Sequence, residues 1–530
     1  MMNKVHSSQF RLFYLFLIIL ISFGITSCSD EDDREIVELP GNDTEDIPLT
    51  NEEQRNYYIN TFAATSLSEY YLWIDEPQVA EKMEEWKIFD DPFTAVKELR
   101  YKNSNGQDID RWTVMLDNFE ESVNSFDGIE TTYGFDFVLY RYDKNNVCAV
   151  VTYIIKGSPA ENAGWKRGDV IIKVNNKYMP LDNDQYYAIV TDELMGGSTL
   201  SVEMVDGKQY TINSVTLQED AVLLTKMFDC QDKKVGYMVY NSFTFDSIHR
   251  LIEECKKFKE SGVKELILDL RYNGGGYGIT SEALASMLVP EAEVKAESVF
   301  QTEVYNKDLT EYYKILNHSN EKKFKTEFKY KLDDEDKIWN TADANIGIEK
   351  LYVIITGYSA SASEALICGL KPYMPVMLIG QKSYGKYCGG FLLGAQEFYD
   401  EYKDPLTKMG IYEAGRKAVY DIGMYVMVSR YADKDGITGC MPDGYIPDIE
   451  VEDNPIDGCQ LGDPEESMLK VALTQAGYQY QDKPSTRSAR SARKDDSILL
   501  LDATKQVYKK NFGILVNNFN SETHYLNIYQ

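Results

Sequence analysis

Residues 351–370 read LYVIITGYSASASEALICGL and contain an apolar strand, a turn of small residues and an apolar helix. The three serines of the turn, Ser359, Ser361 and Ser363, stand at the mouth of the predicted helix. A serine hydroxyl placed there is close to backbone N–H groups that have no partner within the helix and can bind a developing anion. The segment therefore predicts a nucleophile that follows a buried strand.

A lysine on a glycine turn, Tyr384-Gly385-Lys386, comes soon after the serine run. None of the four histidines of the chain (6, 249, 318 and 524) is near either segment, so a serine hydrolase built here needs another base. Lysine serves as a base only when it is neutral, and its reference pKa of about 10.4 must then fall by several units. Burial among apolar groups has that effect, so we expect a dry pocket around Lys386.

The composition is that of a globular protein and excludes several classes. The chain has 530 residues, 43% apolar and 26% charged, which suits two to four packed domains. The net charge of −30 argues against nucleic acid as a partner. No CxxC motif and no Cys/His cluster occurs, so the sequence predicts neither a metal site nor a cofactor. Seven cysteines follow Cys28, so at least one thiol is free or forms an intermolecular bridge.

The N-terminus has the pattern of a targeting segment. Lys4 and Arg11 precede an apolar run over residues 12–21, and Ile25-Thr26-Ser27-Cys28 follows. This order resembles a bacterial lipobox, which implies a signal peptide over 1–27 and lipidation of Cys28; an ordinary signal peptide or an anchor helix is the alternative. Residues 28–50 are acidic and predict a tether. The lipoprotein resemblance implies a partner membrane, the outer membrane of a Gram-negative-type bacterium. The acidic run resembles a surface-export signal, with a solvated tether as the alternative.

Residues 51–120 have helical spacing and predict a small helical domain, whereas residues 121–220 contain short strand-like runs separated by turns. Residues 157–169, GSPAENAGWKRGD, resemble the core motif of PDZ domains. That resemblance implies a carboxylate-binding loop at Tyr133-Gly134-Phe135-Asp136, whose backbone N–H groups hold the C-terminus of a peptide. The alternative is a β-rich packing module without a ligand.

Residues 221–482 alternate strands and helices, which predicts an α/β layered core. Two stretches inside this region, 296–345 and 387–420, have the composition of insertions and no predicted place in the core. Residues 483–494 form a basic linker, and residues 495–530 form a short tail.

Three segments, Leu266–Gly276, Ser359–Glu364 and Tyr384–Lys386, resemble the signature blocks of the C-terminal processing (tail-specific) serine peptidase family. They occur in the family's order behind the PDZ-like segment, and the resemblance covers roughly residues 120–475. It implies a multidomain α/β protein with a crotonase-like (ClpP/crotonase) catalytic domain. The spacing of 25 residues between nucleophile and base in that family selects Ser361 and Lys386 as the catalytic pair.

The same resemblance implies that Gly275 and Ala362 form the oxyanion hole. In one place the chain departs from the family pattern: many members have a glutamine four residues after the lysine, which orients it, and this chain has Gly390. Glu364 and Ser363 are therefore candidate orienting residues, although Glu364 in this position also suits a helix cap.

These observations predict a lipid-anchored serine endopeptidase of the cell envelope that recruits polypeptide substrates by their C-termini. Two alternatives remain at this point. The missing glutamine is compatible with a catalytically impaired lipoprotein that binds peptides without cutting them. An acyl hydrolase acting on a non-peptide substrate is the other alternative.

Overall fold

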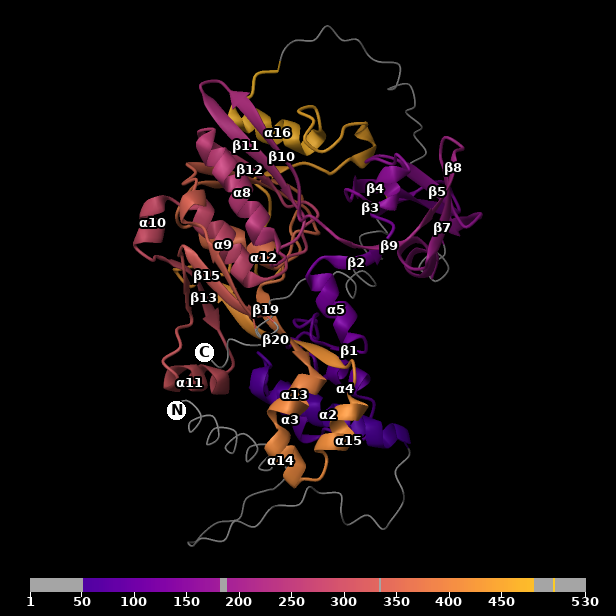
Figure 1. Ribbon diagram of the computed structural model, residues 1–530, viewed down its shortest axis with the longest axis vertical. Helices are drawn as coiled ribbons and strands as arrows, with labels where there is room; N and C mark the ends of the chain where they lie inside the picture. The colour runs from indigo at the N-terminus through magenta and orange to yellow at the C-terminus, as the bar shows by residue number, and fades with distance from the viewer. Residues whose placement is uncertain (1–50, 182–187, 333–334, 481–498, 501–530) are drawn as a thin grey trace.

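The computed structural model describes residues 51–181, 188–332, 335–480 and 499–500 (Figure 1). The predicted signal peptide, Cys28, the acidic tether, the basic linker and most of the tail lie outside the described residues. Within the described ranges, no helix is both long enough and apolar enough to cross a membrane.

A six-stranded sheet forms the centre of the larger body, with its strands in the order β10-β11-β12-β17-β18-β21. All neighbours are parallel except the antiparallel pair β10–β11. The strands are β10 (Val222–Cys230), β11 (Lys233–Tyr240), β12 (Val263–Asp269), β17 (Lys350–Ile355), β18 (Val376–Gly380) and β21 (Ile449–Glu450).

Both faces of this sheet are covered by helices, because alternate residues of each buried strand point to opposite faces. Leu266 and Leu268 of β12 join a core with α8 (Ser247–Glu260), α9 (Gly278–Leu288) and α12 (Ala362–Leu370). Ile267 joins a second core with α16 (Ser467–Ala476). The mixed α/β core predicted from the alternation of strands and helices is confirmed.

A second sheet packs on the outer side of α12, which contacts β13 and β20. It unites distant parts of the chain: the order is β1-β20-β13-β14, and β19 pairs with β20. Segments 296–345 and 387–420, which the sequence did not assign to the core, both contribute strands to this second sheet. Its strands are β1 (Val114–Leu116), β13 (Val299–Val304), β14 (Glu321–Lys323), β19 (Cys388–Gly394) and β20 (Gly423–Ala432).

Helices from the start of the chain share one apolar core with helices of the segment 387–420, at the lower end of Figure 1. They are α2 (Asn51–Tyr70), α3 (Pro77–Glu84), α4 (Pro92–Leu99), α13 (Ala395–Glu401), α14 (Lys403–Lys408) and α15 (Tyr412–Ala418). The remaining elements of the larger body are α5 (Phe119–Phe126), α10 (Glu291–Lys295), α11 (Lys307–Ile315), β15 (Glu327–Leu332) and β16 (Glu335–Asn340).

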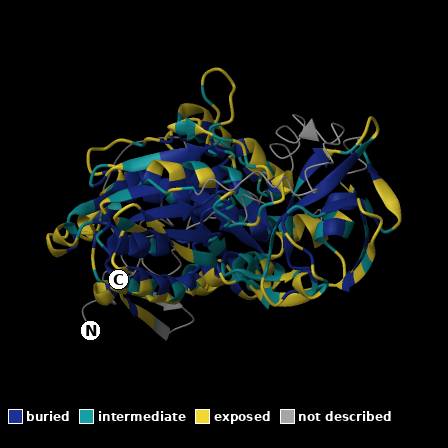
Figure 2. Cartoon of the chain, turned by 90° about the horizontal axis from the view of Figure 1, so that it is seen from above, coloured by how far each residue is buried: buried dark blue, intermediate teal, exposed yellow. Residues whose placement is uncertain are grey.

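The PDZ-like region forms a separate body with its own buried core, on the right in Figures 1 and 2. Its sheet has the order β22-β3-β4-β6-β5-β7-β8, and a two-stranded ribbon, β2–β9, leads to the larger body. Its elements are β2 (Ile129–Thr132), β3 (Phe135–Arg141), β4 (Asn146–Ile154), α6 (Pro159–Asn162), β5 (Val170–Val174), β6 (Lys177–Pro180), η1 (Ile189–Met195), β7 (Thr199–Met204), β8 (Gln209–Asn213), β9 (Val215–Gln218) and β22 (Leu499–Leu500).

Candidate active site

The serine run forms the sharp connection between β17 and α12. Ser361 is the residue just before α12, with φ 54° and ψ −114°, and its side chain is almost fully buried. A residue with a side chain rarely adopts a positive φ, and such strain, on the order of 1–3 kcal/mol, is concentrated at functional sites. The turn therefore holds Ser361 in a conformation that the surrounding packing must enforce.

The other two serines of the run have structural contacts. The Ser359 hydroxyl donates to the Leu270 carbonyl at 2.7 Å, and the Ser363 hydroxyl donates to the Asn273 carbonyl at 3.0 Å. Both bonds tie the turn to the loop that follows β12. Ser363 thus contacts the glycine turn rather than the lysine, and Ser361 is the serine at the strained position.

The glycine turn after β12 lies directly against Ser361. A Cβ atom added to Gly275, which has φ +117°, would lie 2.8 Å from the Cβ of Ser361 and 3.1 Å from the nitrogen of Ala362. Only a residue without a side chain allows this approach. The Gly275 N–H donates to the Asn273 side-chain oxygen at 2.8 Å, so an oxyanion bound here would have to share or displace that bond.

Lys386 is fully buried in an aromatic pocket. Its amine is 3.0 Å from the Tyr425 hydroxyl and 4.8 Å from the centre of the Tyr425 ring. The Trp112 ring centre is 5.9 Å from the amine. These aromatic groups exclude water from the lysine side chain, as expected of a lysine that acts as a base.

The Glu364 carboxylate joins the serine turn to the lysine turn. It accepts from the N–H groups of Ser361 at 3.2 Å, Gly385 at 2.7 Å and Lys386 at 2.8 Å, and from the Ser383 hydroxyl. Burial raises the pKa of Glu364 to about 7, and these hydrogen bonds oppose that rise. Glu364 therefore fixes the backbone of both proposed catalytic residues without touching the lysine amine.

Tyr431 adds a second link between the two turns. Its hydroxyl donates to the Lys386 carbonyl at 2.8 Å and lies 3.4 Å from the Ser361 carbonyl. The backbones of Ser361 and Lys386 are therefore held on either side of one buried hydroxyl.

The predicted carboxylate-binding loop packs against the PDZ-like core motif. The Gly134 N–H donates to the Thr132 hydroxyl at 3.0 Å, and the Gly134 carbonyl accepts from the Ser158 hydroxyl at 3.1 Å. Tyr133 and Phe135 are buried. Ser158 also caps α6 through the Glu161 N–H, so the motif residues position the loop.

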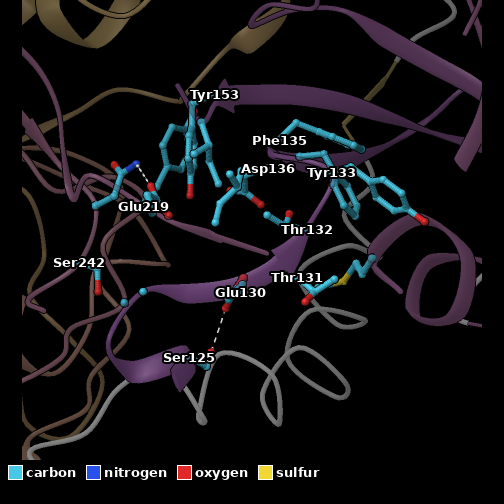
Figure 3. Close-up of a pocket in the computed structure, with 18 of the residues that line it drawn as sticks. Ser125, Glu130, Thr131, Thr132, Tyr133, Phe135, Asp136, Tyr153, Glu219 and Ser242 are labelled. Atoms are coloured by element: carbon cyan, nitrogen blue, oxygen red, sulfur yellow. Dashed lines mark hydrogen bonds between the residues drawn. The ribbon is translucent and has the colours of Figure 1, made fainter. Parts of the chain in front are cut away.

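A cavity of about 240 Å³ connects this loop to the glycine turn (Figure 3). Its lining includes Tyr133, Phe135 and Asp136 on the PDZ-like side, and Gly274 and Gly275 on the catalytic side. A peptide in this cavity would therefore pass from the predicted recruitment loop to the glycine turn that packs against Ser361.

Three carboxyl groups line the same cavity, and its described lining contains no lysine, arginine or histidine. Glu130 accepts from Ser125, Asp136 from Thr152 and Glu219 from Asn241. Burial, with a smaller contribution from neighbouring carboxylates, raises the pKa of Asp136 to about 6 and that of Glu219 to about 7. A peptide carboxylate bound here would depend on backbone N–H groups, because no described cation faces it.

The structure thus brings Ser361, Lys386, Gly275 and Ala362 to one place, with Glu364 among them. Sequence reasoning missed Trp112, Tyr425 and Asn273. No local pattern marks Trp112 or Tyr425, since both reach the lysine from other parts of the chain; Asn273 stood inside a quoted block but without an assigned role. Across the described residues, no group of three or more His, Cys, Asp or Glu side chains is arranged to hold a metal ion.

Two regions of the chain match models of known families. Residues 234–451 match the family model described as peptidase family S41, and residues 150–193 match that of the PDZ domain. A probable CtpA-like serine protease of Staphylococcus aureus (strain N315) is 27% identical over 262 residues, or 48% of this chain. The match spans 45% of that relative's own length.

A second relative, a probable CtpA-like serine protease of Staphylococcus saprophyticus, is 23% identical over 384 residues, covering 70% of this chain and 65% of the relative. Among solved structures, an S41-family protein from Bacteroides fragilis NCTC 9343 is similar with a TM-score of 0.57 and 22% identity. That match covers 78% of this chain and 96% of the other, and it indicates a shared fold.

Proposed function

We propose that this chain, which carries a peptidase domain of family S41 behind a PDZ domain, is a serine endopeptidase of the C-terminal processing type. Ser361 is the nucleophile and Lys386 the general base. The substrates are polypeptides, recruited by their C-termini at the loop Tyr133-Gly134-Phe135-Asp136.

The single observation that carries this proposal is the bridge made by Glu364. One buried carboxylate accepts from the N–H groups of Ser361, Gly385 and Lys386, so the serine and lysine turns form one rigid unit. Gly275 packs against Ser361 in the same unit. A rigid, dry arrangement of nucleophile, base and N–H donors is what acyl transfer requires.

The reaction follows from these positions. The Ser361 oxygen attacks the scissile carbonyl carbon, and the serine proton passes to the neutral Lys386 amine. The N–H groups of Gly275 and Ala362 bind the oxyanion. The C–N bond then breaks, the proton moves from lysine to the leaving amine, and water hydrolyses the acyl ester on Ser361.

The finer organisation belongs to the same proposal. The parallel part of the central sheet and its covering helices support a crotonase-like catalytic domain over residues 221–482, behind a PDZ domain over 121–220. A helical domain over 51–120 is proposed from its helical spacing. Residues 1–27 as a signal peptide, the lipidated Cys28 and an outer-membrane, surface-exposed location are proposed from the sequence pattern.

Cleavage of an unstructured peptide with a free C-terminus tests the activity. The wild-type protein is expected to cut the peptide, whereas Ser361→Ala is expected to have no turnover and an unchanged circular dichroism spectrum. The same peptide with an amidated C-terminus is expected to be cut with a lower kcat/KM, because the loop loses a charged acceptor.

If wild type and Ser361→Ala were equally inert while the peptide still bound, the chain would be a peptide receptor. If Ser361 were acylated by an ester without any peptide turnover, the chain would be an acyl hydrolase of another substrate class.

A further inference from the structure

The lysine amine has a hydrogen-bond partner that the sequence did not identify. Tyr425, on β20, places its hydroxyl 3.0 Å from the amine of Lys386. Both side chains are buried. The tyrosine is 39 residues away along the chain, and it reaches the lysine because β19, which begins two residues after Lys386, pairs with β20.

The Tyr425 ring occupies the space above Gly390, the position four residues after the lysine. A Cβ atom on Gly390 would lie 2.6 Å from a ring carbon of Tyr425 and 2.5 Å from the methyl group of Met427. Any side chain at 390 would therefore collide with the tyrosine. The glycine at 390 and the tyrosine at 425 are two parts of one packing arrangement across the β19–β20 pair.

We propose that Tyr425 is the positioning residue of Lys386, taking from the opposite strand the place that a side chain at position 390 would otherwise fill. This inference rests on the function proposed above. The amine donates one N–H to the hydroxyl oxygen, and this bond does not use the nitrogen lone pair. The hydrogen bond thereby fixes the orientation of the base without consuming its basicity.

Replacing Tyr425 by phenylalanine tests the proposal, because the ring that fills the space above Gly390 is kept and only the hydroxyl is lost. We expect kcat to fall roughly 10- to 100-fold with KM nearly unchanged, a part of the 10²- to 10⁴-fold that a positioned base typically contributes. Tyr399→Phe is the matched control: Tyr399 is also fully buried, and its hydroxyl donates to the distant Tyr58 carbonyl. The control is expected to keep the wild-type kcat.

A double variant that changes the side chains at positions 425 and 390 separates the positioning of Lys386 from the packing of the Tyr425 ring. Tyr425→Ala removes both ring and hydroxyl, and adding Gly390→Gln returns an amide oxygen to the lysine from its own strand. The double variant is expected to recover at least tenfold in kcat over Tyr425→Ala alone. Gly390→Gln in the presence of Tyr425 is expected to lower the melting temperature, because the two side chains collide.

The labelling of Ser361 by a fluorophosphonate keeps the two proposals apart. If the wild type is not labelled, the proposed function fails and this inference fails with it. If the wild type is labelled and turns over peptide while Tyr425→Phe keeps the wild-type kcat, only the inference is overturned. A double variant no faster than Tyr425→Ala also overturns it.

Discussion

Glu364 is a buried side chain that both holds the candidate site together and affects the stability of the fold. Its carboxylate is completely buried and accepts four hydrogen bonds from the serine and lysine turns. Burial nevertheless outweighs these bonds and raises the pKa of Glu364 to about 7. Between about pH 4.5 and pH 7, Glu364 is therefore protonated in the folded protein and ionised in the unfolded chain.

The raised pKa of Glu364 makes the free energy of unfolding depend on pH. A carboxyl group with a raised folded-state pKa contributes stability at low pH that is lost as the pH rises to 7. Glu364→Gln removes this titration, so the destabilisation caused by the substitution is expected to be largest near pH 4.5 and to shrink by about 3 kcal/mol by pH 8. Urea unfolding of both proteins across this range measures it.

Glu254 provides the control of opposite sign. Its burial favours the neutral form, but hydrogen bonds from Lys257 and Thr225 and the charge of Arg250 outweigh this and lower its pKa. Glu254→Gln should therefore cost most at high pH and least at low pH. A penalty for Glu364→Gln that grew with pH, as for Glu254→Gln, would contradict the assignment.

At the residue scale the sequence identified the members of the candidate site that carry a local pattern. The run with Ser361, the glycine turn and the lysine turn each carry a local pattern, and the resemblance to the peptidase family, with its spacing of 25 residues, selects one serine of three. Tyr425 and Trp112 carry no such pattern, because their proximity to Lys386 arises from strand pairing over long sequence separations. No periodicity of the sequence encodes that pairing.

Among the elements, those with a strong local signal have bounds that match it. Residues 247–260 have an amphipathic pattern, and α8 has those bounds. Residues 135–141 form a strand-like run, and β3 has those bounds. The strands in segments 296–345 and 387–420 could not be placed, because β13 and β19 both pair with β20, and β20 also pairs with β1, which lies about 300 residues earlier.

The glycine turn after β12 gives a prediction at this scale. Gly275→Ala forces a side chain into a left-handed conformation and to within 2.8 Å of the Ser361 Cβ atom. The turn must move away from Ser361, so the N–H of residue 275 leaves the oxyanion position. We expect kcat to fall on the order of 100-fold, the typical loss for one oxyanion donor, measured with the peptide substrate.

Gly106→Ala is the matched control, since Gly106 also has a positive φ of +76° but has no atom within 4 Å of an added Cβ. It carries the conformational cost of about 1 kcal/mol without a collision, and its kcat should equal that of the wild type. Equal kcat values in the two variants would show that the turn does not serve the reaction.

On the scale of the whole molecule, a buried ionic network joins the PDZ-like body to the catalytic body. Arg167, from the PDZ-like motif, is 2.6 Å from Asp453 of the catalytic region. Arg271 reaches Asp453 at 3.0 Å and Glu466 at 2.7 Å. Burial opposes the ionisation of Glu466, but the charge of Arg271 lowers its pKa to about 2. Glu466 therefore stays ionised at physiological pH.

This network joins the body that carries the proposed recruitment loop to the body that carries the proposed nucleophile, because Arg167 and the loop belong to the same small body. Arg167 also donates to the Thr152 carbonyl at 3.1 Å and to the Tyr272 hydroxyl, and Tyr272 precedes the glycine turn by two residues. Removing the arginine therefore loosens a connection that runs from the PDZ-like sheet to the oxyanion site.

Arg167→Ala is expected to destabilise the protein by about 3–5 kcal/mol, because it leaves Asp453 with one fewer cation in a nearly dry interface. Arg416→Ala breaks an ion pair with Asp400 in which both side chains are more than 40% exposed, and it should cost about 1 kcal/mol or less. Urea unfolding compares the stabilities of the two variants.

The kcat/KM for a long peptide, which spans the recruitment loop and Ser361, should fall in Arg167→Ala by more than that for a short peptide cut without reaching the loop. An equal fall for both peptides would mean that the network stabilises the fold without aligning the two bodies.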